Sequence, residues 1–384
     1  MQKIQIRLYT NHNMSKLIGF LYRNVLKNIL FLRDAEHMHS AFGKVGYILG
    51  KYKITRYITH KLFYYEHPYL AQKVLDIKFD NPIGIAWGFD KDILLPNIAG
   101  DIGFGWEEVW SITYGAYKWN PGKRLIRLKS SKWILVNYGL KNKWISYAKD
   151  RLQSINPKIP ILVSIAKTNC TKTTDTENGI QDYLSSVQKL KNLDSVSGFV
   201  LNISCPNSFG GEDFATPAHL EQLLKNIIKL NISKPILVKL PIDKSWEDLS
   251  KLIKICIKYN ISWVIISNLI KNREHIKEKE IIHDLPWGIS GIPTRERSDY
   301  LIWETYKSFG DKIKIIWVGG IFSAQDAYNK IRQWASLVQL ITGMIYQWPQ
   351  LIGDINKWLV DLMEKDGYNH ISQAIWANHT RSSQ

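Results

Sequence analysis

The sequence has few cysteines and no long apolar run, and both absences exclude classes of protein. Only Cys170, Cys205 and Cys256 occur among 384 residues, and no two of them have C-x-x-C spacing. Three cysteines cannot form a disulfide framework, and without that spacing a zinc knuckle is not expected. No apolar stretch reaches the roughly 18 residues that a membrane-spanning helix needs. The expected environment is therefore reducing and cytoplasmic, or the cytoplasmic side of a membrane surface.

Several nucleotide and metal motifs are also missing. There is no Gly-x-Gly-x-x-Gly or Walker-type loop, so neither a Rossmann dinucleotide site nor an NTPase is expected. There is no His-Glu-x-x-His pattern either, and we expect no metal site. Hydrophobic residues make up 45% and charged residues 22%, which allows a sizeable core and excludes a disordered or collagen-like chain.

Negative charge is scarce relative to positive charge. Lys and Arg number 51 against 34 Asp and Glu, a formal net charge of +17. Such an excess is typical of a protein with an anionic partner: nucleic acid, an acidic membrane surface or a phosphorylated ligand. Compositional drift towards Lys in an Ile-, Lys- and Asn-rich chain is an alternative explanation. No nucleic-acid-binding motif occurs, so we expect no nucleic-acid partner.

The positive charge is concentrated in residues 1–77, which hold 12 basic and 4 acidic residues. Apolar residues between 17 and 31 recur at helical spacing with Lys and Arg between them. This pattern is typical of a basic amphipathic helix at a membrane interface. A helix packed on the neighbouring domain would look the same, and both can hold together. We predict that residues 1–77 are a helical, basic, membrane-docking region.

From residue 80 onward, short apolar runs alternate with helical segments. Continuous apolar strands between helices indicate a parallel sheet that is buried on both sides. Eight such units favour an α/β fold, a (β/α)₈ TIM barrel with an N-terminal helical extension, over an open doubly wound sheet. We assign residues 78–362 to the barrel and 363–384 to a C-terminal tail. The predicted strands are Ile83–Ala86, Glu108–Ile112, Ile161–Ile165, Gly198–Ile203, Ile236–Leu240, Trp263–Ser267, Ile313–Val318 and Leu337–Thr342.

Polar residues cluster where these runs end, which is the face of a barrel that carries its chemistry. Cys205 follows one run and is flanked by Asn202 and Asn207; it is either a base or nucleophile, or a buried structural cysteine. Lys239 lies within an apolar run, and a buried lysine there needs an anionic partner. Gly319-Gly320 lets backbone N–H groups approach a phosphate, or simply forms a tight turn.

In this order, the motifs resemble dihydroorotate dehydrogenase. The resemblance covers residues 80–345, and the front part also matches, because 34–39 (DAEHMH) resembles a stretch of the membrane-associated, quinone-reducing class. Each motif is weak alone, but the ordered set is specific. The matching segments are 81–91 (NPIGIAWGFDK), 124–128 (RLIRL), 137–140 (NYGL), 202–207 (NISCPN), 238–239 (VK), 267–268 (SN), 288–291 (GISG), 318–320 (VGG) and 335–340 (ASLVQL).

The resemblance implies FMN-dependent oxidation of (S)-dihydroorotate to orotate in pyrimidine biosynthesis, with electrons passed to a membrane quinone. Cys205 would be the catalytic base that removes the C5 proton, while hydride passes from C6 to the flavin. His39 and Arg127 match positions at the quinone tunnel, so residues 1–77 would also be the quinone-docking region. The implied FMN-binding residues are Ala86, Trp87, Gly88, Lys91, Ser111, Ser164, Asn202, Lys239, Ser267, Gly291, Gly320, Ile341 and Thr342. The implied substrate-binding residues are Lys91, Asn137, Gly139, Leu140, Asn202, Asn207 and Asn268.

The chain departs from the family pattern at several positions. The quinone class uses serine as the base, whereas cysteine marks the soluble class, which reduces fumarate or NAD. Gly210-Gly211 after the base also resembles the soluble NAD-linked group. Trp87 replaces a small residue beside the flavin, Ser164 replaces an asparagine, and Ile341 replaces a tunnel tyrosine.

These departures leave other functions and a second location open. The alternatives are the soluble class, another FMN barrel oxidoreductase, and a non-catalytic membrane-associated barrel. We expect a peripheral protein on the cytoplasmic side of an anionic cell membrane, with a cytoplasmic location as the alternative. Residues 1–13 resemble nothing in the family, so Met14 is an alternative start to Met1.

Overall fold

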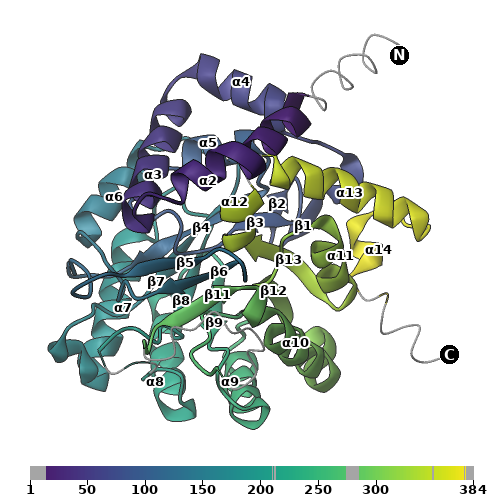
Figure 1. The fold of residues 1–384 in the computed structure, drawn as a ribbon. Helices are drawn as coiled ribbons and strands as arrows, with labels where there is room; N and C mark the ends of the chain where they lie inside the picture. Colours follow the sequence, from purple (N-terminus) through teal and green to yellow (C-terminus); the bar gives the residue numbers. More distant parts are fainter. Residues whose placement is uncertain are drawn as a thin grey trace.

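A closed barrel of eight parallel strands forms the centre of the molecule (Figure 1). The computed structural model describes residues 14–209, 211, 213–273, 285–347, 350–375 and 377. The predicted TIM barrel is confirmed, and each predicted strand overlaps one barrel strand. In order around the barrel the strands are β3 (Ile83–Ile85), β4 (Trp106–Ile112), β7 (Ile161–Ile165), β8 (Gly198–Asn202), β9 (Ile236–Leu240), β10 (Trp263–Ile266), β12 (Lys314–Val318) and β13 (Ala335–Leu340).

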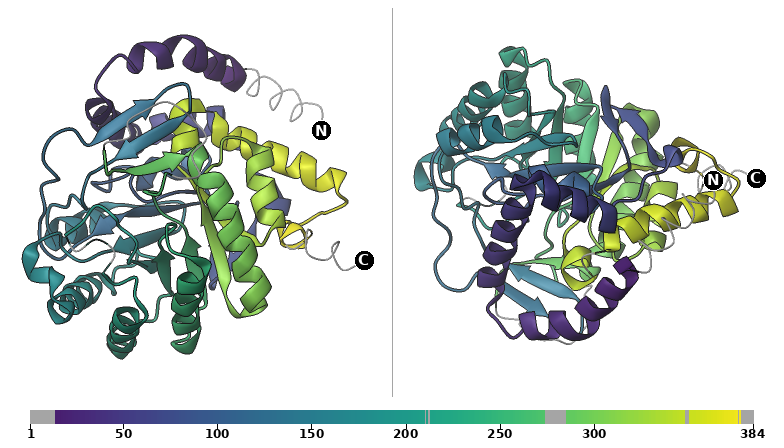
Figure 2. Two further views of the ribbon diagram at one scale, coloured as in Figure 1. Left: turned by 60° about the horizontal axis from the view of Figure 1, so that its bottom comes forward. Right: turned by 90° about the horizontal axis from the view of Figure 1, so that it is seen from above.

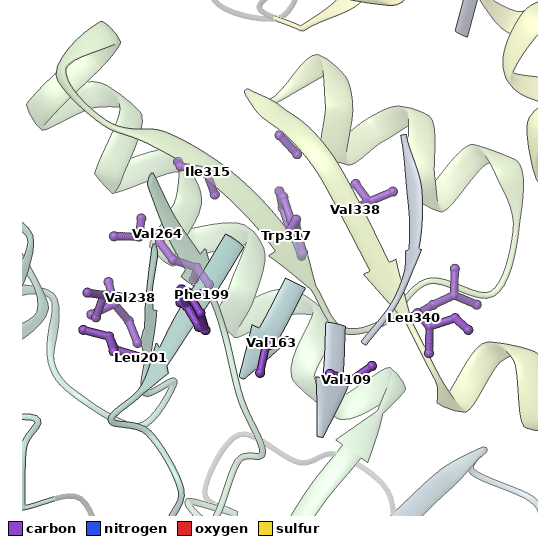
Figure 3. Packing of buried hydrophobic residues seen from close by; sticks show 14 of the residues in the cluster. Val109, Val163, Phe199, Leu201, Val238, Val264, Ile315, Trp317, Val338 and Leu340 are labelled. Atoms are coloured by element: carbon purple, nitrogen blue, oxygen red, sulfur yellow. The ribbon is translucent and has the colours of Figure 1, made fainter. Parts of the chain in front are cut away.

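The period of two along each strand separates two kinds of packing. Alternate residues such as Val109, Val163 and Val238 belong to the cluster that the strands share with the surrounding helices (Figure 3). The residues between them form a second cluster inside the barrel, which includes Trp106 and Leu162. The inward positions nearer the carboxyl ends of the strands are polar instead. The barrel interior is therefore apolar at the amino-terminal end of the strands and lined by polar side chains at the carboxyl end.

Helices surround the barrel between successive strands (Figure 2). Helix α8 begins at Pro217 with Thr216 as its N-cap, whose side chain accepts the His219 amide N–H. This start was predicted from the Thr-Pro pair and is confirmed. The helices that follow the N-terminal region are α5 (Pro96–Ile102), α6 (Ile145–Ser154), α7 (Thr176–Leu190), α8 (Pro217–Ile227), α9 (Trp246–Lys258), α10 (Arg295–Phe309), α11 (Ala324–Arg332), α12 (Thr342–Gln347), α13 (Leu351–Lys365) and α14 (Ile371–Ala374).

A short hairpin closes the amino-terminal end of the barrel. Its strands are β1 (Gln72–Val74) and β2 (Ile77–Phe79). Phe79 is fully buried against the inner cluster, in an edge-to-face contact with Trp106. The hairpin spans the predicted domain boundary at 77/78, and α13 spans the one at 362/363. Residues 1–13 and 378–384 of the predicted end regions lie outside the described residues.

A three-stranded antiparallel sheet lies apart from the barrel strands. It consists of β5 (Leu125–Leu128), β6 (Trp133–Val136) and β11 (Gly288–Gly291), in the order β11-β6-β5. The sequence analysis did not predict these strands. They are short, and they are paired with each other rather than with the apolar runs of the barrel. This sheet is the wall between the barrel site and the N-terminal helices.

The N-terminal helices lie over this sheet (Figures 1 and 2). Residues 14–21 are helical and continue into a π-turn (Tyr22–Leu26), α2 (Lys27–Leu30), α3 (Ala35–Lys51) and α4 (Lys53–Phe63). Tyr22 donates its hydroxyl to the Ile345 carbonyl oxygen at 2.7 Å, which attaches the first helix to the barrel. Among the described residues no helix is both long and apolar enough to span a bilayer.

Candidate active site

A hydrogen-bonded polar layer lines the carboxyl end of the barrel. Ser111 of β4 and Ser164 of β7 lie 2.9 Å apart, oxygen to oxygen, and the Asn202 amide donates to Ser111 at 2.7 Å. Asn202 Oδ1 in turn accepts the Ser204 hydroxyl, and Asn268 Nδ2 donates to Ser204 Oγ at 2.7 Å. All five side chains occupy strand ends, so the barrel brings together residues that lie up to 157 positions apart in the sequence.

Cys205 lies just beyond β8 at this same end. Cys205 is 6% exposed and packs with Leu140 and Ala166. It also borders a small cavity of about 230 Å³, together with Lys167 and Asp213. Lys167 is buried and pairs with Asp213 at 2.5 Å. The thiol therefore borders a cavity whose lining includes the Lys167–Asp213 ion pair, in contrast to Cys256, which is buried in the apolar core.

Asn137 and Asn207 are held together by a residue that the sequence analysis missed. Asn120 Nδ2 donates to Asn137 Oδ1 at 2.9 Å and to the Asn207 carbonyl oxygen at 3.1 Å. Asn120 stands in an Asn-Pro-Gly sequence, which is typical of a turn and carries no signal of a site. Asn169, also missed, donates to the Gly139 carbonyl oxygen at 2.7 Å.

Lys239 is fully buried and has a protein partner. Its Nζ lies 3.2 Å from Glu108 Oε2, and Gln339 donates to that same oxygen at 2.7 Å. Burial lowers the pKa of Lys239 to about 8, against the opposing effect of Glu108. The anionic partner expected from the sequence is thus supplied in part by the barrel itself. The ring of Trp87 covers the ammonium, with its centroid 5.0 Å from Nζ.

A cavity of about 850 Å³ opens between the barrel rim and the three-stranded sheet. Ser267 lines it and has a buried hydroxyl without a hydrogen-bond partner among the described residues. At Gly291 (φ +108°) a Cβ would lie 2.5 Å from the Lys132 carbonyl oxygen, so only glycine fits. Predicted cofactor residues that line the cavity are Ala86, Trp87, Gly88, Lys91, Ser267, Gly291, Gly320, Ile341 and Thr342.

Of the remaining predicted residues, Asn268 also lines this cavity, and the others lie around it. Lys239 lies behind Trp87, and Ser111, Ser164 and Asn202 belong to the polar layer described above. Asn268 and Lys91 line the large cavity, whereas Leu140 and Asn202 border the small one beside Cys205. Trp87 and Trp110 both line the large cavity, with ring centroids 5.2 Å apart, so any occupant must lie against indole rings.

Lys91 contacts the N-terminal region. Its Nζ lies 2.8 Å from His39 Nε2 of α3 and 3.8 Å from the centre of the Tyr138 ring. Burial, followed by the charge of Lys141, holds the pKa of Lys91 well below its usual range. Burial and then Lys91 lower the pKa of His39 likewise. Both shifts favour uncharged forms, as expected for two cationic groups that share a buried site.

A second, apolar cavity of about 970 Å³ lies under the N-terminal helices. His39 and Arg127, the two predicted quinone-site residues, both line it. Arg127 donates to the Arg33 carbonyl oxygen and stacks on Phe31, 4.4 Å from the ring centre. Three residues line both this cavity and the rim cavity, and so form a shared wall: Leu125, Ile134 and Ile345.

A barrel rim with a cavity, a thiol and converging carboxamides also agrees with the comparisons with known proteins. The family model for dihydroorotate dehydrogenase matches residues 69–363. The chain belongs to the dihydroorotate dehydrogenase family. A dihydroorotate dehydrogenase (quinone) of Crocosphaera subtropica is 35% identical over 351 residues, which is 88% of this chain and 89% of that protein. One of Nautilia profundicola is 33% identical over 353 residues, 92% and 96% of the two chains.

Solved structures agree with the barrel. A crystal structure of DHODH from Eimeria tenella in complex with ferulenol superposes with a TM-score of 0.79 at 22% identity, and covers 89% of this chain and 95% of that chain. At this identity the likeness supports the fold. The predicted family, fold and enzyme class are therefore confirmed, and the relatives at about 35% identity favour the quinone class over the soluble class.

Proposed function

We propose that this dihydroorotate dehydrogenase uses Cys205 as its base and FMN as its bound flavin, and passes electrons to a quinone in the apolar cavity. The overall change converts dihydroorotate and quinone into orotate and quinol. The observation that carries the proposal is the position of Cys205: a thiol just beyond β8, next to Ser204, whose hydroxyl is bonded to Asn202, and beside a cavity that contains the Lys167–Asp213 pair.

The base must take a proton from a carbon, so it has to reach its thiolate form. A cation and polar groups nearby favour a thiolate, and Lys167 borders the same cavity as Cys205. Asn137, Asn207 and Asn268 offer amide donors and acceptors of the kind that a pyrimidine ring with carbonyl and N–H groups requires. Lys91 could hold the substrate carboxylate. These residues orient the ring so that its proton faces Cys205.

The large cavity suits a flavin mononucleotide in its chemistry. The buried Ser267 hydroxyl supplies an unused hydrogen-bonding group, and Gly291 and Gly320, both with positive φ, allow backbone N–H groups to approach a phosphate. Ala86, Gly88 and Thr342 would complete the contacts. When bound, the flavin supplies the two-electron acceptor for dihydroorotate. Lys239 would stabilise negative charge near the ring, moderated by its pairing with Glu108.

The apolar cavity under the helices suits a quinone, because its lining is aliphatic and aromatic with few polar groups. His39 and Arg127 would supply the hydrogen-bond donors for the quinone oxygens. The wall shared by the two cavities, which includes Leu125 and Ile345, is thin enough that the same side chains line both sides. Electrons leaving the barrel site thus have a short path to this cavity.

The outer face of the N-terminal helices suits a membrane surface. Its apolar side chains are exposed, for example 57% for Phe20 and 55% for Ile29. Lys16 and Arg23 lie in the same helical stretch. An apolar face with basic residues binds anionic lipid peripherally. We expect co-sedimentation with phosphatidylglycerol vesicles, and weaker binding to phosphatidylcholine vesicles.

The test is a stepwise flavin experiment with the purified protein. Under anaerobic conditions, dihydroorotate should bleach the absorbance of the oxidised flavin. Addition of a short-chain ubiquinone or menaquinone should then restore it, whereas fumarate and NAD should not. Extraction and chromatography identify the flavin as FMN or another form. A protein that takes up no flavin, or whose flavin is not bleached, would contradict the proposal.

A further inference from the structure

Asn120 lies at the centre of the hydrogen bonds between the carboxamides assigned to the substrate. Its Nδ2 faces the Asn207 carbonyl oxygen, which can only accept, so this atom must be the amide nitrogen. Its Oδ1 accepts the Tyr117 hydroxyl at 2.7 Å, which is consistent with that orientation. The second contact of Nδ2 goes to Asn137 Oδ1 at 2.9 Å. The orientation of Asn120 therefore determines which end of Asn137 remains for a ligand.

The two carboxamides consequently present opposite ends. Because Asn120 engages Asn137 Oδ1, the Asn137 amide nitrogen is the end that can donate to a ligand. Asn207 donates its own Nδ2 to the Val136 carbonyl oxygen at 3.0 Å, which leaves its Oδ1 as the end that can accept. One donor and one acceptor match the carbonyl and N–H groups on the edge of a dihydropyrimidine.

The position of Asn120 also depends on Gly139. A Cβ at Gly139 would lie 2.3 Å from Asn120 Oδ1, and the backbone there has φ +70°. A glycine is thus required for Asn120 to reach the carboxamides. The Asn120 backbone is fixed too, since its N–H donates to the Tyr138 carbonyl oxygen at 3.2 Å.

The loop that carries Asn120 is attached to helix α3 by a charged pair. Glu36 in the first turn of α3 accepts three bonds from Arg124: from the backbone N–H at 2.7 Å, from Nε at 2.8 Å and from Nη2 at 2.6 Å. Arg124 Nη1 then donates to the Asn120 carbonyl oxygen at 3.1 Å. Both side chains of the pair are largely buried, at 16% and 17% exposure, so water screens the pair little. Asp34 caps α3 and holds Glu36 at its start.

We propose that Asn120 is a positioning residue for the substrate carboxamides, and that Glu36 of the N-terminal helices holds it in place through Arg124. The proposal rests on the proposed function, because it assumes that Asn137 and Asn207 bind the pyrimidine. It assigns the N-terminal helices a role in substrate binding besides the quinone site. By linkage, loosening α3 should weaken orotate binding even when the quinone cavity is not used.

The test measures the Kd of orotate by its perturbation of the oxidised flavin spectrum in the holoenzyme, together with KM and kcat for dihydroorotate with a soluble dye. For Asn120→Ala we expect the Kd and the KM to rise about 10- to 100-fold, with a smaller change in kcat. For Glu36→Gln we expect a rise of roughly 5-fold, since the pair is weakened but not removed. The double variant should bind orotate no worse than Asn120→Ala alone.

Matched controls separate positioning from general damage. Asn226→Ala on α8 changes a partly exposed asparagine and Glu66→Gln after α4 changes an exposed glutamate, and both should leave the orotate Kd unchanged. Flavin content and Tm are measured for every variant. Should Asn120→Ala not fold, Arg124→Lys replaces it: this variant keeps the charge but loses the forked contact with Glu36, and should raise the Kd about 5-fold or more.

Two results would overturn the proposal. One is a wild-type orotate Kd in Asn120→Ala or Glu36→Gln. The other is a double variant whose loss is the sum of the two single losses, because Glu36 would then act independently of Asn120. A wild-type protein that binds no orotate would instead count against the proposed function itself, so the two failures are distinguishable.

Discussion

The barrel and the N-terminal helices bury their apolar residues in different ways. Barrel residues such as Val238 and Val264 are fully buried by neighbouring strands and helices of the same chain. In residues 14–32, by contrast, Leu17, Phe20 and Ile29 are all more than half exposed. The barrel is complete in itself, whereas the helices present an apolar surface that the described chain does not cover. Exposed apolar patches of this kind mark a surface that binds something else.

The two regions also treat charge differently. Inside the barrel Lys239 is paired with Glu108, and both side chains have no exposure. On the helices most basic side chains face outward. Where the regions meet, Asp101 of α5 is fully buried and holds Arg56 of α4 at 2.9 Å and Lys158 at 2.6 Å. Charge is therefore paired internally in the barrel and left largely exposed on the helices.

The largest effect is expected from the thiol. Cys205→Ala should lower dihydroorotate oxidation about 10³-fold, because a positioned general base is removed, while flavin content stays the same. Anaerobic stopped-flow bleaching of the flavin measures the step directly. Cys170→Ser, a partly exposed cysteine, is the control and should retain full activity. Near-normal bleaching of the flavin in Cys205→Ala would contradict the assignment of Cys205 as the catalytic base.

The next largest effect is expected from breaking the buried ion pair between Lys239 and Glu108. Lys239→Met leaves Glu108 charged and unpaired inside the barrel, and should lower the free energy of unfolding by about 3–5 kcal/mol. Adding Glu108→Gln should recover much of that loss, because the stranded charge is then gone. Urea unfolding followed by circular dichroism measures both. Lys254→Met, on the exposed face of α9, should have little effect; an equal loss there would show that the pairing is not the cause.

A smaller effect is expected from filling the apolar cavity, which should affect the reduction of a quinone but not that of a soluble dye. Ala35 is 7% exposed and lines the apolar cavity at the start of α3. Ala35→Phe should partly fill that cavity and lower kcat/KM for a quinone at least about tenfold, a loss typical of a blocked apolar site. Reduction of a soluble dye should be unchanged. Ile48→Phe on the exposed face of the same helix is the control, and equal losses with both acceptors would argue against a quinone cavity.

The smallest effect concerns a buried carboxyl group in the barrel wall that lies beside a second carboxyl group. Glu107 is fully buried beside Asp90, and burial, followed by the Asp90 charge, raises the pKa of Glu107 well above its usual range. The folded protein thus keeps a proton that the unfolded chain releases, so the free energy of unfolding falls as pH rises above the ordinary glutamate pKa. Glu107→Gln should raise stability by roughly 1–2 kcal/mol near pH 8.

Acid should abolish the stability gain of Glu107→Gln. Below the ordinary glutamate pKa, Glu107 is protonated in both the folded and the unfolded wild-type protein. Thermal unfolding between pH 4 and pH 9 measures it. Asp101→Asn provides the contrast: Asp101 is buried but paired with Arg56 and Lys158, so its replacement should destabilise the protein and loosen α4. A stability gain from Asp101→Asn would refute the division between paired and unpaired carboxyl groups.

The sequence predicted much of the fold and part of the site. The eight apolar runs correspond to the eight barrel strands, because a strand buried on both faces reads as a continuous apolar segment. The Thr216-Pro217 start of α8 was predictable because capping is local. The roles of Cys205 and the carboxamides came from a resemblance and stay predictions. The strands β5, β6 and β11 were missed because they are short and pair with each other.

Sequence alone determined which polar residues lie at the strand ends, since a strand buried on both faces is a continuous apolar segment whose end is visible along the chain. It thereby placed Asn202 and Lys239 at the carboxyl end of the barrel. Only the tertiary structure decided their partners. Glu108 reaches Lys239 from 131 positions away, and Glu36 reaches Arg124 from 88 positions away. A pattern along the chain encodes where a strand ends, whereas the partner of a side chain there depends on how distant segments close around the barrel.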